Sequence, residues 1–180
     1  MCYCSVDRLP NNWLGHIGEF TLYPISLGFD EAVNRIETLL KNGHDAEALV
    51  TSVFTLEKTM RRSLKIAILA RGFSLKQSQR FTERKGFGEL KEMWDLFDKE
   101  HRTLPIFIGN QDWQNIPTAV EMRNKLVHGT TVYKLSKCKE FADHVLTALM
   151  KLRTTVQSEY RRDPWQRITG KRNPRLQWIA

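Results

Sequence analysis

The chain has 180 residues, a formal charge of +8 at neutral pH, and 41% hydrophobic and 27% charged residues. These values are ordinary for one globular domain, and no apolar run approaches the roughly 20 residues that cross a bilayer. We expect no membrane contact, and the absence of a basic and apolar leader argues against secretion. The cysteines Cys2, Cys4 and Cys138 suit neither a disulfide framework nor a zinc site, which predicts a cytoplasmic location without metal or cofactor.

Proline and glycine interrupt residues 1–28, which predicts an irregular N-terminal arm. From residue 29 the apolar spacing becomes helical, and Gly43 closes this first helix. The apolar residues of the first helix are Phe29, Ala32, Val33, Ile36, Leu39 and Leu40. A second helix is predicted from about Asp45 to Arg71, before Gly72. Its apolar stripe comprises Leu49, Val53, Leu56, Met60, Leu64 and Ala67.

The middle of the chain predicts shorter elements. Residues 74–85 suit a short helix or an exposed basic loop, and residues 89–101 suit an amphipathic helix. The inward residues of that amphipathic helix are Leu90, Met93, Trp94 and Phe97. Residues 104–108 are too short and too closely bounded by proline and glycine for a helix, so we expect a packed connection.

The last long helix is predicted to begin near Ser136. Its apolar positions alternate steps of four and three, which is typical of a bundle or of a helical dimer contact. These positions are Cys138, Ala142, Val145, Leu149, Leu152, Val156 and Tyr160.

Arg123 lies in the middle of the apolar side of another predicted helix, in which Pro117 suits the first turn. On a wheel of about 100° per residue, five apolar residues fall within about 60° on either side of Arg123. They are Ile116, Ala119, Val120, Leu126 and Val127. Because desolvating an unpaired guanidinium costs several kcal/mol, we expect an anion to meet it.

His128 follows Arg123 by five positions, and Gly129 suits the position just after a helix. In the last turn the helix dipole favours a protonated imidazole, and a side chain that titrates near neutrality suits proton transfer. Asn124 shares a face with His128. On a straight helix His128 points about 140° away from Arg123, so the two converge only if the helix end distorts or a second chain completes the site.

Glu57 lies at the edge of the apolar stripe of the second helix, four residues before Arg61. A Glu–Arg pair at this spacing is common on helix surfaces. The alternative is that Glu57 supplies the anionic partner of Arg123, and both interpretations remain open.

The basic tail, residues 161–180, interleaves Trp165 and Trp178 with cations. Its basic residues are Arg161, Arg162, Arg167, Lys171, Arg172 and Arg175. This pattern suits a nucleic-acid strand, through phosphate attraction and base stacking. The alternative is a solvated tail whose tryptophans pack back on the body.

The segment Arg123-Asn124-Lys125-Leu126-Val127-His128 resembles the signature of the HEPN superfamily, an Arg followed after four to six residues by a His. The helix order supports the resemblance, because a long helix pair precedes the segment and one long helix follows it. The resemblance implies an all-α, up-and-down bundle of four to five helices in a domain of residues 29–160. It also implies a homodimer that brings two copies of the motif into one cleft.

Catalytic members of this superfamily cleave RNA without metal. Carried over to this chain, Arg123 would stabilise the scissile phosphate and its developing charge. His128 would act as the general base on the ribose 2′-OH or as the acid to the leaving oxygen, and Asn124 would orient His128 or the phosphate. Further substrate contacts are expected from Lys125, Arg61 and Arg62.

The first hypothesis is therefore a dimeric, metal-independent endoribonuclease that acts as a toxin or host-defence effector, with an antitoxin or regulatory protein as a possible partner. The second is a non-catalytic helical binding module in which Arg123, paired with Glu57, is structural. The third is a nucleic-acid-binding regulator that uses the basic tail.

Overall fold

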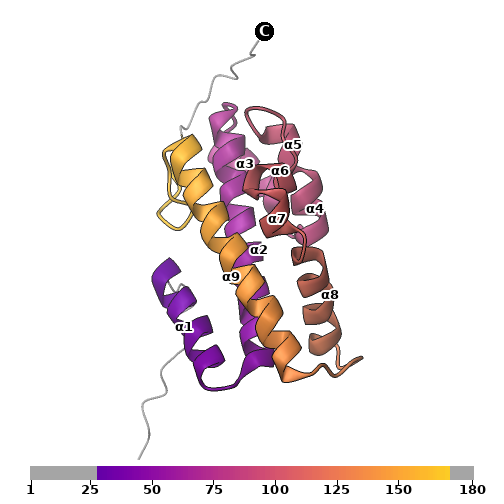
Figure 1. Cartoon of the computed structure of the whole chain (residues 1–180). Helices are drawn as coiled ribbons and strands as arrows, with labels where there is room; N and C mark the ends of the chain where they lie inside the picture. The colour runs from indigo at the N-terminus through magenta and orange to yellow at the C-terminus, as the bar shows by residue number, and fades with distance from the viewer. Residues whose placement is uncertain (1–27, 171–180) are drawn as a thin grey trace, which may run out of the picture.

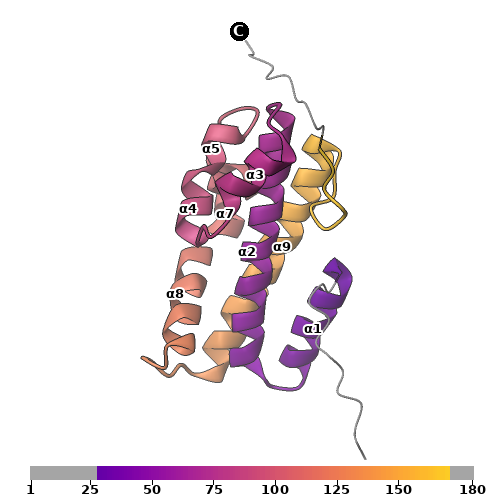
Figure 2. The same ribbon diagram turned by 180° about the vertical axis from the view of Figure 1, so that it is seen from behind.

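The computed structural model describes residues 28–170, and this part of the chain is all-α, as predicted. Four long helices run in alternating directions along one axis (Figures 1 and 2). They are α1 (Phe29–Lys41), α2 (Asp45–Ala70), α8 (Ile116–Val127) and α9 (Leu135–Tyr160). The N-terminal arm predicted for residues 1–28 lies outside the described residues, except for Gly28.

Short helices connect α2 to α8 at one end of the molecule (Figure 1). They are α3 (Leu75–Thr82), α4 (Phe87–Glu92), α5 (Trp94–Phe97), α6 (Leu104–Ile108) and α7 (Asn110–Trp113). The described helices include none with the length and apolar character that a membrane crossing requires.

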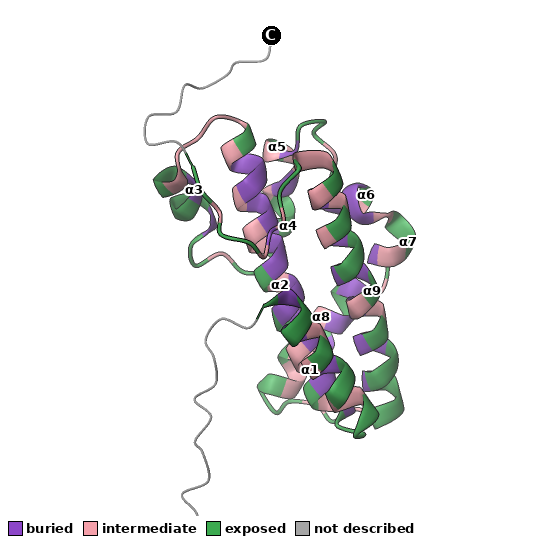
Figure 3. Cartoon of the chain, turned by 90° about the vertical axis from the view of Figure 1, so that its left-hand side faces the viewer, coloured by how far each residue is buried: buried purple, intermediate pink, exposed green. Residues whose placement is uncertain are grey.

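Helices α2 and α9 form the centre of the bundle and pack against each other along their length. Every residue of the predicted apolar stripe of α2 is fully buried, and so is the predicted seam of α9 from Cys138 to Val156. Figure 3 shows these buried faces turned inward and the exposed residues on the outer faces. The α9 seam therefore builds the core of one chain, so of its two predicted uses the bundle is the one observed.

The prediction of one helix over residues 89–101 is wrong, because this stretch breaks into α4 and α5 and leaves helical geometry at Asp98. The Asp98 carboxylate accepts hydrogen bonds from the backbone N–H groups of Glu100 and Arg102, at 3.2 and 3.1 Å. An aspartate that bonds to nearby backbone offers the chain an alternative to the helical ladder. Leu90 and Trp94 are nevertheless buried, as predicted.

Residues 104–108, expected to be a non-helical connection, form the one-turn helix α6. Pro105 lies in its first turn, where the missing N–H costs nothing, and Gly109, at φ 121°, ends it. Leu104 and Ile108 are buried as a packed connection requires. In α8 the expected core position of Val127 is wrong, because this residue at the helix end is 53% exposed.

The first ten residues of the basic tail pack back on the helical body. The Trp165 ring meets Phe29 edge-to-face at 5.6 Å, and its indole Nε1 donates to Thr59 Oγ1 at 3.0 Å. Arg153 on α9 binds Asp163 at 2.7 Å. Of the two alternatives for the tail, packing is thus observed for Trp165, whereas Trp178 lies outside the described residues.

Truncation at two points tests this packing. Deleting residues 161–180 removes Trp165 and is expected to lower the free energy of unfolding by about 2 to 4 kcal/mol, since large aromatic deletions cost about this much. Deleting residues 171–180 leaves every contact above in place and is expected to leave the free energy unchanged. Urea unfolding of the two truncated proteins measures the difference, and equal stability of both would show that Trp165 contributes nothing.

A charged network holds the short helices against the end of α9. Arg102 binds Asp98 at 2.9 Å and also binds Glu159, while Tyr160 Oη donates to Asp98 at 2.9 Å. Burial disfavours the Asp98 carboxylate, but hydrogen bonds from Arg102 and Tyr160 outweigh it and lower its pKa. The hydrogen bond from Arg102 likewise lowers the pKa of Glu159.

These lowered pKa values predict acid sensitivity. A carboxylate whose pKa is lower in the folded than in the unfolded chain stabilises the fold above the unfolded pKa of about 4, and this contribution is lost as the pH falls further. We expect a constant free energy of unfolding between about pH 7 and 5.5 and a steady decrease below about pH 4. Denaturant unfolding at a series of pH values measures this, and an Asp98→Asn protein should show a shallower decrease.

Candidate functional site

The end of α8 is closed by a glycine turn that fixes the position of His128. Gly129 has φ 64°, a conformation that suits glycine, and its N–H donates to the carbonyl of Leu126 at 3.1 Å. The backbone N–H of Thr130 donates to the carbonyl of Lys125 at 3.0 Å. His128 is the last residue before this turn, as the sequence predicted, and its N–H donates to the carbonyl of Asn124.

Arg123 meets the anionic partner that its position on α8 requires. Its Nη2 lies 3.1 Å from Glu57 Oε2 on α2, and only 13% of the Arg123 side chain is exposed. The guanidinium carbon lies 4.6 Å from the centre of the Phe54 ring, one turn before Glu57. Arg123 Nε is buried and has no hydrogen-bond partner among the described residues. The guanidinium is therefore held in place with donor capacity left over.

Glu57 also binds Arg61, so both predicted pairings exist together. Arg61 Nη2 lies 2.9 Å from Glu57 Oε1 and 2.7 Å from the carbonyl oxygen of Lys85. One carboxylate is thus shared by two guanidinium groups, and this cluster of three side chains retains a net positive charge. Arg61 also ties α2 to the segment after α3.

His128 and Asn124 are exposed, and neither side chain makes a hydrogen bond, ion pair or ring contact with the described residues. The imidazole is accordingly free to meet a substrate or a second chain. The Arg123 guanidinium is largely buried against α2, whereas the His128 imidazole lies at the exposed end of α8. No described contact joins the two side chains.

The other candidate residues already have partners in the fold. Lys125 Nζ binds Glu121 at 2.6 Å on the outer face of α8, and this hydrogen bond raises the pKa of Lys125. Arg62 Nη2 donates to the carbonyl of Gln166 at 2.7 Å, and Arg62 Nε donates to that of Pro164. Arg62 thereby fastens the beginning of the tail to α2.

Two features near the candidate site were not predicted from the sequence. Phe54, 49% exposed, stacks on Arg123, and its position one turn before Glu57 was the available signal. A basic pocket also lies between α2 and α3, and part of its signal was the four-residue spacing of Lys76 and Arg80 on α3. Such spacing places side chains on one helix face.

Comparison with known proteins assigns no family to the chain. No model of a protein family matches the chain, and searches of curated proteins and of solved structures found no match. Within residues 28–170 no group of His, Cys, Asp and Glu side chains is arranged to hold a metal ion.

Proposed function

We propose that this protein is a metal-independent endoribonuclease that acts as a homodimer with the HEPN-like architecture. Arg123 stabilises the scissile phosphate, and His128 transfers the proton. The observation that carries the proposal is the end of α8, where Gly129 fixes an exposed, unpartnered His128 one turn beyond an Arg123 that Glu57 holds in place.

In the proposed reaction the ribose 2′-oxygen attacks the adjacent phosphorus, and the bond from phosphorus to the 5′-oxygen breaks. A histidine accepts the proton of the 2′-OH, and a protonated histidine donates to the departing 5′-oxygen. Arg123 Nη1, which has no hydrogen-bond partner among the described residues, donates to a phosphate oxygen on which charge develops. The products are a 2′,3′-cyclic phosphate and a 5′-hydroxyl.

A dimer would bring together Arg123 and His128, which have no described contact in one chain. Since His128 and Arg123 have no described contact within the chain, a two-fold axis near the end of α8 would bring His128 of one chain to Arg123 of the other. A symmetric pair would also place two histidines in one cleft, so that one accepts a proton while the other donates. Asn124, exposed on the same face, would then orient His128 or the phosphate.

The test is cleavage of a labelled RNA in excess chelator by the wild-type protein and by a His128→Ala protein. We expect cleavage by the wild type alone, with cyclic phosphate ends, and no cleavage where a 2′-deoxy residue replaces the nucleotide attacked. If the wild type and the variant leave RNA equally intact, the enzyme proposal fails.

The contact between Arg123 and Glu57 also favours a second candidate, a non-catalytic helical binding module in which Arg123 is structural. Removing one partner of a largely buried ion pair costs about 3 kcal/mol. The melting temperature of an Arg123→Ala protein should therefore fall under both proposals. The two proposals differ in the activity of the wild type. If the protein is a binding module, the wild type itself cleaves no RNA, so the substitution has no activity to remove.

We further propose that uncontrolled cleavage harms the cell that makes the protein, as a toxin or host-defence effector would. Expression of the wild type should then arrest growth, and expression of the His128→Ala protein should not. A protein that relieves the arrest when co-expressed would be the antitoxin or regulatory partner.

A further inference from the structure

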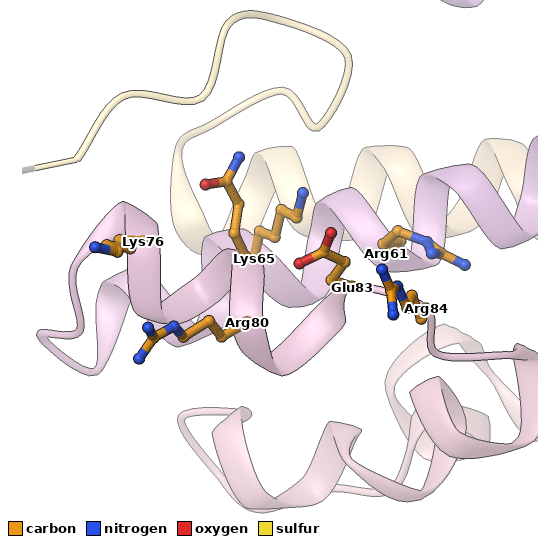
Figure 4. Close-up of a pocket in the computed structure, with 7 residues that line it drawn as sticks. Arg61, Lys65, Lys76, Arg80, Glu83 and Arg84 are labelled. Atoms are coloured by element: carbon orange, nitrogen blue, oxygen red, sulfur yellow. The ribbon is translucent and has the colours of Figure 1, made fainter.

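A pocket of about 460 Å³ lies between α2 and α3, and Figure 4 shows its lining side chains. We call it the α2–α3 basic pocket. Its lining residues are Arg61, Lys65, Lys76, Gln79, Arg80, Glu83 and Arg84. The lining therefore contains five cations and one carboxylate. We propose that this pocket binds the phosphate backbone of the RNA strand that the Arg123–His128 site cleaves, an inference that rests on the proposed function.

Most cations of the pocket lack a carboxylate partner within the described part of the chain. Lys76, Arg80 and Arg84 make no hydrogen bond or ion pair with the described residues. Elsewhere in the fold Arg102 and Arg153 are held by carboxylates at hydrogen-bond distance. The pocket thus concentrates positive charge that the protein itself does not neutralise, which is the condition for binding a polyanion.

The excess of positive charge also affects the Lys65 amine. Burial lowers the pKa of this amine, and the neighbouring Arg62 and Arg61 lower it further, while Glu83 opposes them. Lys65 makes no hydrogen bond or ion pair within the described part of the chain. A bound phosphate would relieve this repulsion.

The pocket is connected to the candidate site along one face of α2. Glu57, Arg61 and Lys65 are spaced by four residues, a rise of about 6 Å per step. Glu57 binds Arg123, Arg61 binds Glu57, and Arg61 also lines the pocket. A strand whose scissile phosphate lies on Arg123 can therefore continue along α2 into the pocket.

The chemistry of the lining favours the backbone over the bases. None of the seven residues is aromatic, so the pocket offers no platform on which a base could stack. Lysine and arginine contacts to phosphates position a strand without reading its sequence. The pocket should accordingly bind RNA of any sequence.

The experiment uses the full-length His128→Ala protein, which cannot degrade the probe, and a fluorescein-labelled single-stranded RNA of 20 nucleotides. The pocket variant adds Lys76→Gln and Arg80→Gln, two side chains without described contacts. The matched control adds Lys139→Gln and Lys151→Gln, which remove the same charge from exposed positions of α9. Fluorescence anisotropy measures the affinity over a range of salt concentrations, and melting curves establish that all proteins are folded.

We expect the pocket variant to bind about 10-fold more weakly than the His128→Ala protein and the control to bind nearly as well as it does. The dependence of log affinity on log salt should become shallower by about 1.4, the value for two lost contacts to a single strand. Equal affinities of variant and control would overturn the proposal. Full displacement of the RNA by tripolyphosphate at equal phosphate concentration would overturn it too, since the pocket would then serve a small phosphate ligand.

The outcome separates this inference from the proposed function. If the wild type cleaves no RNA but the pocket variant still loses RNA affinity, the enzyme proposal fails while the pocket remains an RNA-backbone site. If the wild type cleaves RNA, the same two substitutions placed in it should raise KM with little change in kcat, because they remove binding rather than chemistry.

Discussion

Replacing His128 by alanine is expected to lower the rate of RNA cleavage by about 10² to 10⁴-fold, the usual contribution of a general acid–base group. The melting temperature should stay unchanged, because the imidazole is exposed and makes no described contact. Single-turnover cleavage of a labelled RNA in chelator measures the rate, and thermal unfolding measures the stability.

The control for this substitution is His44→Ala. His44 is also exposed and lies at the beginning of α2, with only a long contact of 3.9 Å to Glu47. The His44→Ala substitution should leave the cleavage rate within about two-fold of the wild type, which is a change in activation free energy below about 0.5 kcal/mol. A His128→Ala protein that cleaves as fast as the His44→Ala protein would remove His128 from the mechanism. Arg123→Ala is a less direct test, since losing the contact with Glu57 also lowers stability.

Replacing Asp98 by alanine is expected to produce the largest loss of stability, about 3 to 5 kcal/mol, or about 6 to 20 °C in melting temperature. The Asp98 side chain is fully buried. Its loss leaves the Tyr160 hydroxyl without its acceptor and Arg102 without one of its three carboxylate partners. The short helices α4 to α6 should loosen from α9, which proteolysis of the folded protein would detect.

Glu92→Ala is the matched control, because it removes the same charge from an exposed position at the end of α4. It should change the free energy of unfolding by less than about 0.5 kcal/mol. If Asp98→Ala and Glu92→Ala proteins unfold at the same urea concentration, the network around Asp98 does not stabilise the fold.

Local pattern was sufficient to predict the long helices, and it offered one long-range contact as one of two alternatives. The stripes of α2 and α9 follow from apolar spacing, and Gly129 predicted where α8 ends. The pairing of Arg123 with Glu57 was anticipated because a guanidinium on a core-facing side needs an anion, and Glu57 lies at the edge of the other stripe.

Several features that could not be predicted from the sequence depend on contacts between residues far apart in the chain. The helix predicted for residues 89–101 ends at Asp98, which accepts hydrogen bonds both from the nearby backbone and from Tyr160, 62 positions later. Arg62 looked available for substrate, but it binds carbonyl groups more than 100 positions away. The spacing of Lys76 and Arg80 indicates a basic helix face, but the α2–α3 basic pocket also needs α3 to pack against α2, which local spacing does not predict.

The central claim is that Arg123 of one chain works with His128 of another. The most direct measurement is the cleavage rate of a purified heterodimer in which one chain carries Arg123→Ala and its partner carries His128→Ala, each with a different affinity tag. Such a heterodimer keeps one Arg123–His128 pair across the interface but only one of the two histidines, so we predict a rate below that of the wild type and well above that of either mutant homodimer. A heterodimer no more active than the homodimers, or a protein that stays monomeric at assay concentrations, would contradict the claim.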